Sequence, residues 1–400
     1  MKVKSGRYFT ALSIGVASVW FSSHCGAGFA SGTQEVSYFV RHGWTTIFMP
    51  IFSMTGVGLI MYVGLEIARL QQVFAYNEVV HKAFVPYNKV LANAYDVYRS
   101  IAMVLAPAAC LAGGAALFNQ IFGLPNFLGT LVMLFLTVLM CIFGAKFIRM
   151  FGTALTILMI ILVLLITGFG IYAFRENIGY HISNRVMYTS YKSSFMFAWT
   201  YLNFQSGMWA VAAAAAVGIR YRNEARGAVI TGVVLNSLML VAVCTMIMGG
   251  MPEVATDAEA KLLPTLYVVN QLDIPFFNIA YPLLLFSALI TTSVGFVFTS
   301  QTRFALIFLK KMENKKLKNA IISTSWLIVV WLVSQFGLLA IINKGYAASG
   351  WISMFLMIVP MSILGIRNKM RYRRMEEEGK LPPGLDNRID ADENPVTESI

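Results

Sequence analysis

Polar residues and glycines interrupt two long apolar segments of this sequence, and those interruptions are where the chain could bind a ligand. The first is the stretch of residues 22–32, Ser-Ser-His-Cys-Gly-Ala-Gly-Phe-Ala-Ser-Gly. Each glycine weakens a helix by about 1 kcal/mol relative to alanine. Because a membrane offers no water to loosened backbone groups, irregular backbone survives there only when it is buried in protein or lines a polar cavity. We therefore expect backbone atoms of this stretch to meet a ligand or an ion.

The two ends of such a break differ in polarity. Amides that begin the outer half of the helix carry a partial positive charge and suit a carboxylate, whereas carbonyls that end the inner half suit an ammonium group. An amino acid is the smallest common ligand that matches both. The predicted substrate contacts from this stretch are Cys25, Gly26, Ala27, Gly28, Phe29, Ala30 and Ser31.

The second interruption lies near the middle of the apolar segment at residues 195–217. It places two amides, a hydroxyl and a glycine where contact with lipid would be unfavourable. Its carbonyls are also expected to face the ammonium group of the same substrate. The predicted contacts from this interruption are Leu202, Asn203, Gln205, Ser206 and Gly207.

Two ionisable residues flank the first interruption. His24 stands directly before the break and titrates near neutral pH. It is either a proton-coupling or substrate-contacting group, or a neutral imidazole bonded to a neighbouring helix. Glu35 lies about 10 Å further out than Gly28 on a helix that rises 1.5 Å per residue. It is either a gate or coupling carboxylate or a residue at the membrane interface.

The composition indicates that membrane helices position these residues. Of the 400 residues, 58% are hydrophobic and only 12% are charged, whereas soluble domains are about 25% charged. The net charge of +12 comes from basic residues in short runs between apolar segments, which is typical of topology signals and not of a nucleic-acid-binding surface. All four cysteines lie inside apolar segments, so we expect no disulfide framework.

Apolar segments long enough to span a bilayer as helices occur ten times. They are residues 8–39, 45–68, 90–118, 127–147, 151–174, 195–217, 228–249, 276–309, 320–342 and 346–366. If the N-terminus is inside, all but six of the 31 Lys and Arg residues fall on the inner side, as the positive-inside rule requires. We therefore predict that both termini are cytoplasmic.

When the ten segments are divided into five and five, the two interrupted segments occupy corresponding positions of an inverted repeat. We predict an all-α membrane protein with a ten-helix transporter domain at residues 1–374, repeats at about residues 8–174 and 195–366, and a disordered cytoplasmic tail at residues 375–400. Paired interruptions in such repeats indicate the binding site of a secondary transporter. The sequence contains no Walker A, G-x-S-x-G or zinc motif, so we expect no enzymatic activity, no cofactor and no ATP hydrolysis.

These features resemble the LeuT-fold carriers of the amino acid–polyamine–organocation superfamily. The run from Gly26 to Gly32, followed by Gln34 and Glu35, is most similar to the YkvI-type amino-acid permeases. The resemblance covers about residues 8–366 and implies a LeuT-like 5+5 inverted repeat with broken first and sixth helices. It implies a transporter without naming the substrate.

The same resemblance implies a sodium site. In sodium-coupled carriers of this fold, carbonyls of the broken first helix and a hydroxyl pair on the eighth helix hold the ion. Carried over to this sequence, the ligands are the carbonyls of Ser22, Cys25 and Leu289 and the hydroxyls of Thr292 and Ser293. The alternative is that both hydroxyls bond to carbonyls four residues earlier on their own helix, since proton-coupled carriers keep the fold without the ion.

The sequence thus predicts an ion-coupled permease, driven by Na+ or H+, for an amino acid or a similar small zwitterion. We expect a multi-pass protein of the plasma or inner membrane that works by alternating access, with the lipid bilayer and a small solute as partners and no nucleic acid. The alternative is a membrane receptor on the same fold that binds its ligand without transporting it. A passive channel fits less well, because broken helices around a central site suit an occluded state.

Overall fold

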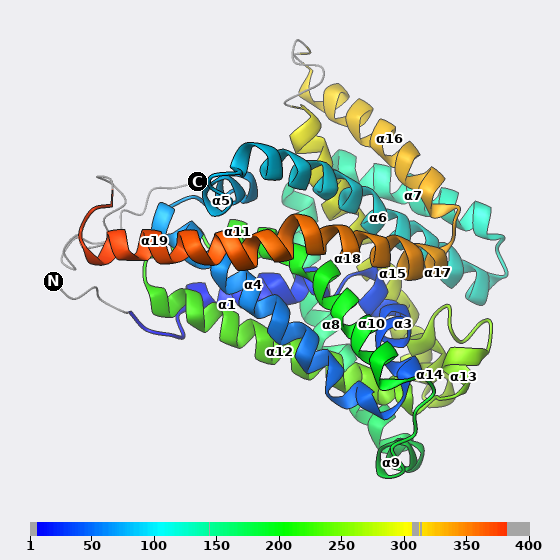
Figure 1. Cartoon of the computed structure of the whole chain (residues 1–400). Helices are drawn as coiled ribbons and strands as arrows, with labels where there is room; N and C mark the ends of the chain where they lie inside the picture. The colour runs from blue at the N-terminus through cyan, green and yellow to red at the C-terminus, as the bar shows by residue number, and fades with distance from the viewer. Residues whose placement is uncertain (1–5, 144, 306–311, 313, 382–400) are drawn as a thin grey trace.

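Helices make up all the named regular elements in the part of the chain that the computed structural model describes, which comprises residues 6–143, 145–305, 312 and 314–381. Figure 1 shows long helices packed side by side. The short helices α13 (Glu253–Thr256) and α14 (Pro264–Gln271) lie towards one end of the bundle, and α19 (Ile366–Glu377) lies towards the other.

Five helical stretches in the described residues are long and apolar enough to cross a membrane. They are Met49–Gln71 (α4), Asn88–Phe122 (α6), Arg222–Met248 (α12), Pro275–Val297 within α15 (Pro275–Ala305), and Leu338–Glu377, which runs from α17 (Leu338–Ala340) through α18 (Ala347–Ser353) to α19. A sixth candidate pairs Ile160–Ala173, within α8 (Ala145–Ala173), with α9 (Arg175–Ser183) across a bend of 71°. Shorter apolar helices lie within α7 (Asn126–Phe143) and α16 (Lys315–Ser334). The chain is therefore a multi-pass membrane protein, and the full count of ten stays a prediction.

The first predicted segment forms three short helices. α1 (Ala11–His24) begins after Thr10, whose side chain accepts a hydrogen bond from the Ser13 amide. α2 (Ala27–Ser31) and α3 (Thr33–Tyr38) follow it. Between these two, Gly32 has a φ of 82°, a left-handed conformation that glycine adopts readily. The glycine-rich stretch therefore contains two breaks, one at Cys25 and Gly26 and a second, unforeseen one at Gly32.

The second interruption stays helical. α10 (Tyr191–Gln205) passes into a single 3-10 turn, η3 (Ser206–Met208), and then into α11 (Trp209–Ala215). The backbone keeps right-handed helical angles at Gln205, Ser206 and Trp209. A single 3-10 turn therefore occurs where the sequence predicted an unwound segment.

Two boundaries near the end of the chain differ from the sequence prediction. α16 ends at Ser334 and the chain turns at Gly337, where φ is 82°. Residues 338–342 therefore begin the last helical run and do not end the predicted ninth segment. That run continues to Glu377, into the predicted tail, because the Glu376 carboxylate is buried in an ion pair. Residues 382–400 of the tail, and residues 144 and 306–309 of the predicted fourth and eighth segments, lie outside the described residues.

Three glycines on α4 explain how closely its neighbours pack. At each one an added Cβ would collide with another helix, at 2.1 Å from Leu202 for Gly56, 2.3 Å from Val233 for Gly58 and 2.9 Å from Trp209 for Gly64. Small residues at such positions let membrane helices approach one another. α4 therefore packs tightly with α10, α11 and α12, and α1 packs against α12 of this group. The helices α6, α7, α15 and α16 pack mainly against each other.

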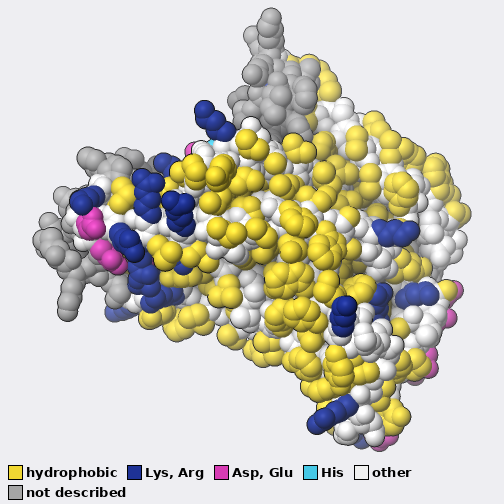
Figure 2. Space-filling model, in the orientation of Figure 1, with side chains coloured by type: hydrophobic (Ala, Val, Ile, Leu, Met, Phe, Trp, Pro, Cys, Tyr) yellow, Lys and Arg dark blue, Asp and Glu magenta, His cyan; other side chains and the backbone are white. Residues whose placement is uncertain are grey.

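The molecular surface is divided by polarity. Figure 2 shows hydrophobic side chains over most of the middle of one face, and Lys and Arg side chains gathered at the end where α19 lies. Exposed large apolar side chains include Leu59 on α4, Leu283 on α15 and Ile363 in the last helical run. An apolar band flanked by basic residues is typical of a membrane-spanning protein.

Candidate functional site

The junction of α1 and α2 leaves backbone groups without helical partners. The Gly26 amide bonds to the His24 carbonyl at 2.8 Å instead of continuing the helix to the Ser22 carbonyl. Among the described residues, no backbone amide bonds to the carbonyl of Ser22 or of Cys25. The next bond, from the Ala30 amide to the Gly26 carbonyl at 2.9 Å, belongs to α2. The two carbonyls beside the break are thus available, and they are the two that the sequence analysis assigned to the ion.

The middle of α15 lies against this break. A Cβ on Gly26 would meet Cγ2 of Thr292 at 3.6 Å, an ordinary contact distance. Ser293 is fully buried, and its hydroxyl lies 3.4 Å from that of Thr137 on α7. Within the described residues, neither the Thr292 hydroxyl nor the Ser293 hydroxyl bonds to a carbonyl of its own helix, whereas the Thr291 hydroxyl donates to the Ser287 carbonyl at 2.8 Å. The structure therefore brings Thr292 to the broken helix, while the Ser293 hydroxyl contacts α7.

Leu289, the remaining predicted ion ligand, is fully buried on α15. Its side chain packs on α6, where a Cβ at Gly113 would meet it at 3.2 Å. In the part of the chain that the structure describes, no three His, Cys, Asp or Glu residues form a group suited to a metal ion. The ligands predicted at this position are all neutral oxygen atoms.

His24 is held on both sides by buried residues of other helices. Its Nδ1 lies 2.7 Å from Oδ1 of Asn236 on α12, and its Nε2 lies 2.7 Å from the Tyr201 hydroxyl on α10. Asn236 donates its amide to the Gly232 carbonyl, so its Oδ1 accepts from the Nδ1–H of His24. Tyr201 then donates to Nε2 and accepts from Gln205 at 3.3 Å. Both nitrogens of a neutral imidazole thus have a hydrogen-bond partner. Through these two bonds His24 links the end of α1 to α10 and α12.

Side chains cover the amides that the sequence analysis assigned to a substrate carboxylate. Gln34 lies over Gly28, where an added Cβ would be only 2.1 Å from its Nε2. The Ser31 hydroxyl donates to the Gly28 carbonyl at 3.1 Å. The Tyr281 hydroxyl donates to the Ala30 carbonyl. The ring of Phe29 lies 5.3 Å from that of His24. In this conformation α2 is therefore enclosed.

The predicted contacts at the end of α10 are partly occupied. The Leu202 carbonyl accepts hydrogen bonds from the Ser206 amide and from the Ser206 hydroxyl, the latter at 2.7 Å, so it is not free to bind an ammonium group here. This bonding is also the reason that the segment stays helical. The Gly207 carbonyl lies 3.5 Å from Nη1 of Arg99 on α6.

Four buried side chains of α3 and α10 keep polar atoms that have no partner within the described protein. Asn203 is fully buried and neither atom of its side-chain amide is bonded. The same holds for both carboxylate oxygens of Glu35 and for Oε1 of Gln34 and of Gln205. Buried polar atoms are normally paired, and the two helices contact each other. A polar ligand beside α10 would satisfy the amide groups of Asn203 and Gln205.

A small cavity of about 20 Å³ lies beside α2 and has room for a water molecule but not for an amino acid. Its lining includes Phe29 and Ala30 of α2, Tyr281 and Thr167. The Thr167 hydroxyl has no partner in the described protein, so it could bond to such a water. The structure therefore shows a closed conformation around α2.

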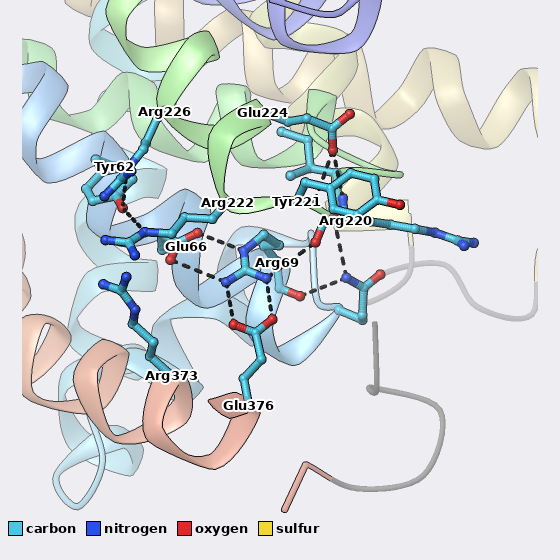
Figure 3. A network of polar contacts seen from close by, with 12 residues as sticks. Tyr62, Glu66, Arg69, Arg220, Tyr221, Arg222, Glu224, Arg226, Arg373 and Glu376 are labelled. Atoms are coloured by element: carbon cyan, nitrogen blue, oxygen red, sulfur yellow. Dashed lines mark hydrogen bonds and ion pairs between the residues drawn. The ribbon is translucent and has the colours of Figure 1, made fainter. Parts of the chain in front are cut away.

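A buried network of charged residues lies near the α19 end of the bundle (Figure 3). Arg69, in the last turn of α4, donates to Glu376 of α19 at 2.6 and 3.0 Å and to Glu66 at 2.7 and 3.4 Å. It also donates to the Arg220 carbonyl at 3.3 Å, in the connection between α11 and α12. Arg69 thus joins three parts of the chain that are far apart in the sequence.

Two residues that the structure places at the break, Tyr201 and Asn236, were not predicted from the sequence. Asn236 had a usable signal, because it is an amide in the middle of an apolar segment. Tyr201 lies at the edge of the second interruption, but tyrosine is frequent in this chain, which has 17, and its type alone did not distinguish it.

No protein-family model and no curated protein sequence matches this chain. Solved structures do match it. MhsT, crystallised in complex with L-phenylalanine, aligns with a TM-score of 0.63 at 15% identity over 92% of this chain and 99% of its own. A Na+-coupled sialic acid symporter, in a substrate-bound outward-open state, aligns with a TM-score of 0.57 at 12% identity over 89% and 78% of the two chains.

A third match is Mhp1, a nucleobase-cation-symport-1 family transporter in a closed conformation with bromovinylhydantoin bound. It aligns with a TM-score of 0.51 at 11% identity over 96% of this chain and 84% of its own. Identities this low establish the fold alone. The chain therefore shares its fold with these three structures, and this is the LeuT fold that the resemblance implied.

Proposed function

We propose that the protein is an ion-coupled secondary transporter for a small zwitterionic solute such as an amino acid, and that it works by alternating access. The observation that carries this proposal is a broken helix beside buried polar groups that lack partners. The free carbonyls of Ser22 and Cys25 lie at the break, and the unpaired groups of Asn203 and Gln205 lie on α10. Groups left unpaired in a buried site cost free energy that a polar ligand recovers.

The architecture proposed for this function has ten membrane helices in two inverted repeats. The first five are the broken run from α1 to α3, then α4, α6, α7 and α8. The second five are the run from α10 to α11, then α12, α15, α16 and the run from α17 to α19. The basic residues of α19 and of the start of α12 support a cytoplasmic location for both termini. The transporter domain then extends to the end of α19, beyond residue 374.

The proposed substrate contacts divide by polarity. The amides at the start of α2, around Gly28, would hold the carboxylate once the Gln34 side chain moves away. Asn203 and Gln205 would bond to the polar groups of the solute. The crystal structure of MhsT in complex with L-phenylalanine supports an amino acid, although the other two neighbours are a sialic acid symporter with its substrate bound and a transporter with bromovinylhydantoin bound.

Sodium is the coupling ion that we propose at the break. Its ligands would be the carbonyls of Ser22 and Cys25 on one side and, on α15, the carbonyl of Leu289 with the hydroxyls of Thr292 and Ser293. The nearness of the Thr292 methyl group to Gly26 supports placing this part of α15 beside the break, and the Na+-coupled symporter and the cation-symport transporter among the structural neighbours support a cation.

Uptake by reconstituted protein tests the proposal. The full chain is placed in proteoliposomes and supplied with a radiolabelled amino-acid mixture under an inward Na+ gradient, an inward H+ gradient or no gradient. We expect accumulation that an ion gradient drives and that an ionophore abolishes. No accumulation under either gradient would overturn transport. Ligand-dependent thermal stabilisation without flux would instead indicate a receptor.

A pair of variants locates the site. Asn203→Ala removes the fully buried amide and should abolish both uptake and ligand stabilisation. Asn270→Ala, at an exposed position of α14, is the matched control and should behave as the unmodified protein. Equal uptake by both variants would exclude Asn203 from the binding site.

A further inference from the structure

Glu35 is a carboxylic acid enclosed in the interior of the molecule. It lies on α3, its side chain is 0% exposed, and neither of its carboxylate oxygens has a hydrogen-bond partner in the described protein. An isolated carboxylate in such surroundings is so costly that the group takes up a proton and becomes neutral. A purely structural role explains neither the burial of Glu35 nor its unpaired oxygens.

Four groups that interact electrostatically with Glu35 are uncharged at neutral pH. They are two thiols and two phenols, contributed by four different helices: Cys25 after α1, Tyr201 on α10, Cys244 on α12 and Tyr281 on α15. Thiols and phenols ionise only at alkaline pH. None of them can balance a negative charge on Glu35.

The basic groups near α3 are engaged elsewhere or exposed. Arg41, in η1 (Val40–His42), lies over the Phe197 ring at 4.2 Å. His42 bonds to Thr189 at 2.6 Å, and His24 bonds to Asn236 and Tyr201. The basic residues of α10 and of η4 (Ile341–Tyr346), Lys192 and Lys344, are exposed. No cation in the described part of the chain compensates Glu35.

We propose that Glu35 is a proton-binding site that couples solute movement to the proton gradient, in addition to the sodium ion proposed at the break. In the closed conformation described here, one carboxylate oxygen carries the proton as an O–H group. When the protein opens to water, the O–H bond breaks, the proton passes to a water molecule, and a solvated carboxylate remains. Reprotonation from water on the opposite side restores the neutral acid. This inference rests on the proposed transport function.

The position of Glu35 explains how its proton could control the site. Gly32 separates α3 from α2. A charge on the Glu35 carboxyl would act electrostatically on Cys25 at the break and on Tyr201, which bonds to His24. A charge on Glu35 would therefore be unfavourable while α2 is enclosed. Protonation would favour the closed conformation, and ionisation would favour an open, hydrated one.

Infrared spectroscopy tests the protonation without any knowledge of the solute. The purified full chain in nanodiscs at neutral pH should show the carbonyl stretch of a protonated carboxylic acid, and Glu35→Gln should lack it. Glu176→Gln, at an exposed position of α9, is the matched control and should retain the band. Since a glutamine at this position keeps the size and neutrality of the protonated acid, we expect the Glu35→Gln variant to fold, as size-exclusion chromatography and helical circular dichroism would verify. An unchanged band in Glu35→Gln would overturn the inference.

A flux measurement separates this inference from the proposed function. Proteoliposomes with an internal pH dye receive the radiolabelled amino-acid mixture. We expect solute entry to acidify the lumen with the unmodified protein. Glu35→Gln should lose acidification and proton-driven accumulation while it still exchanges internal for external solute. Transport by Glu35→Gln with normal acidification would refute the role of Glu35 alone, whereas no transport by the unmodified protein would refute the proposed function.

Discussion

Glu376→Gln removes one charge from the buried network around Arg69 and tests how that network stabilises the protein. The carboxylate of Glu376 is only 5% exposed and accepts two hydrogen bonds from Arg69, at 2.6 and 3.0 Å. The variant keeps the size of the side chain, but it leaves a guanidinium that has only Glu66 as its ionised partner, at 2.7 Å.

The expected loss of folding free energy in Glu376→Gln follows from the burial of this ion pair. A hydrogen bond to a charged group contributes about 1.5–3 kcal/mol, and removing one partner of a buried ion pair costs about 3–5 kcal/mol. Because Glu66 still pairs with Arg69, we expect the free energy of unfolding to fall by about 3 kcal/mol, the lower end of the range for a broken buried ion pair. Such a loss is large relative to the usual stability of a folded protein.

The next residue on the same helix provides the control. Glu377 is 58% exposed and pairs with Arg373 at 3.3 Å, and a surface pair of this kind contributes less than about 1 kcal/mol. Thermal unfolding of the purified protein, followed by tryptophan fluorescence, should therefore show a clearly lower midpoint for Glu376→Gln and an unchanged one for Glu377→Gln. Equal midpoints for the two variants would refute the reasoning.

Three further predictions concern the helix contacts and the break. Gly227→Ala places a Cβ 1.6 Å from a backbone carbonyl of the N-terminal segment, and such overpacking should destabilise the protein by about 2 kcal/mol, measured by thermal unfolding. Tyr201→Phe leaves Nε2 of His24 without a donor and should cost about 1–3 kcal/mol in the same assay, with uptake reduced. Thr292→Ala removes a proposed sodium ligand and should abolish the stabilisation of the protein by Na+ in a thermal-shift titration with NaCl against choline chloride.

Matched controls accompany these predictions. Gly168→Ala on α8 meets nothing within 4 Å and should be neutral or slightly stabilising, since alanine is the better helix former. Tyr180→Phe, at an exposed position of α9, should leave stability unchanged. Thr291→Ala removes a hydroxyl that bonds within its own helix and should keep the Na+ response. Loss of that response in Thr291→Ala as well would argue against a specific site at Thr292.

The sequence predicted the features that depend on local composition. Apolar segments located the long helices, and the glycines after His24 located the place where α1 ends. It did not predict the turn at Gly337, because one glycine between two apolar stretches does not reveal which way the chain turns. It also predicted unwound backbone after Leu202, whereas Ser206 bonds to the Leu202 carbonyl there and keeps the segment helical.

The contacts that sequence reasoning could not predict join distant residues. His24 bonds to Tyr201 and Asn236, which lie 177 and 212 positions further along the chain. A histidine before a glycine-rich break does not indicate which of several polar groups on other helices will meet it. The burial of Glu35 likewise depends on α10 and α12, which contact α3 only in the folded protein.

The bond between Arg69 and Glu376 also sets an order of events during synthesis. The two residues are 307 positions apart, so at about 5–20 residues per second the ribosome needs roughly 15–60 s to make the second after the first. During that interval Arg69 has Glu66 beside it on α4, but Glu376, which supplies the second carboxylate bound by its guanidinium, has not yet been made. The ion pair at the α19 end of the bundle can therefore form only after Glu376 has been made.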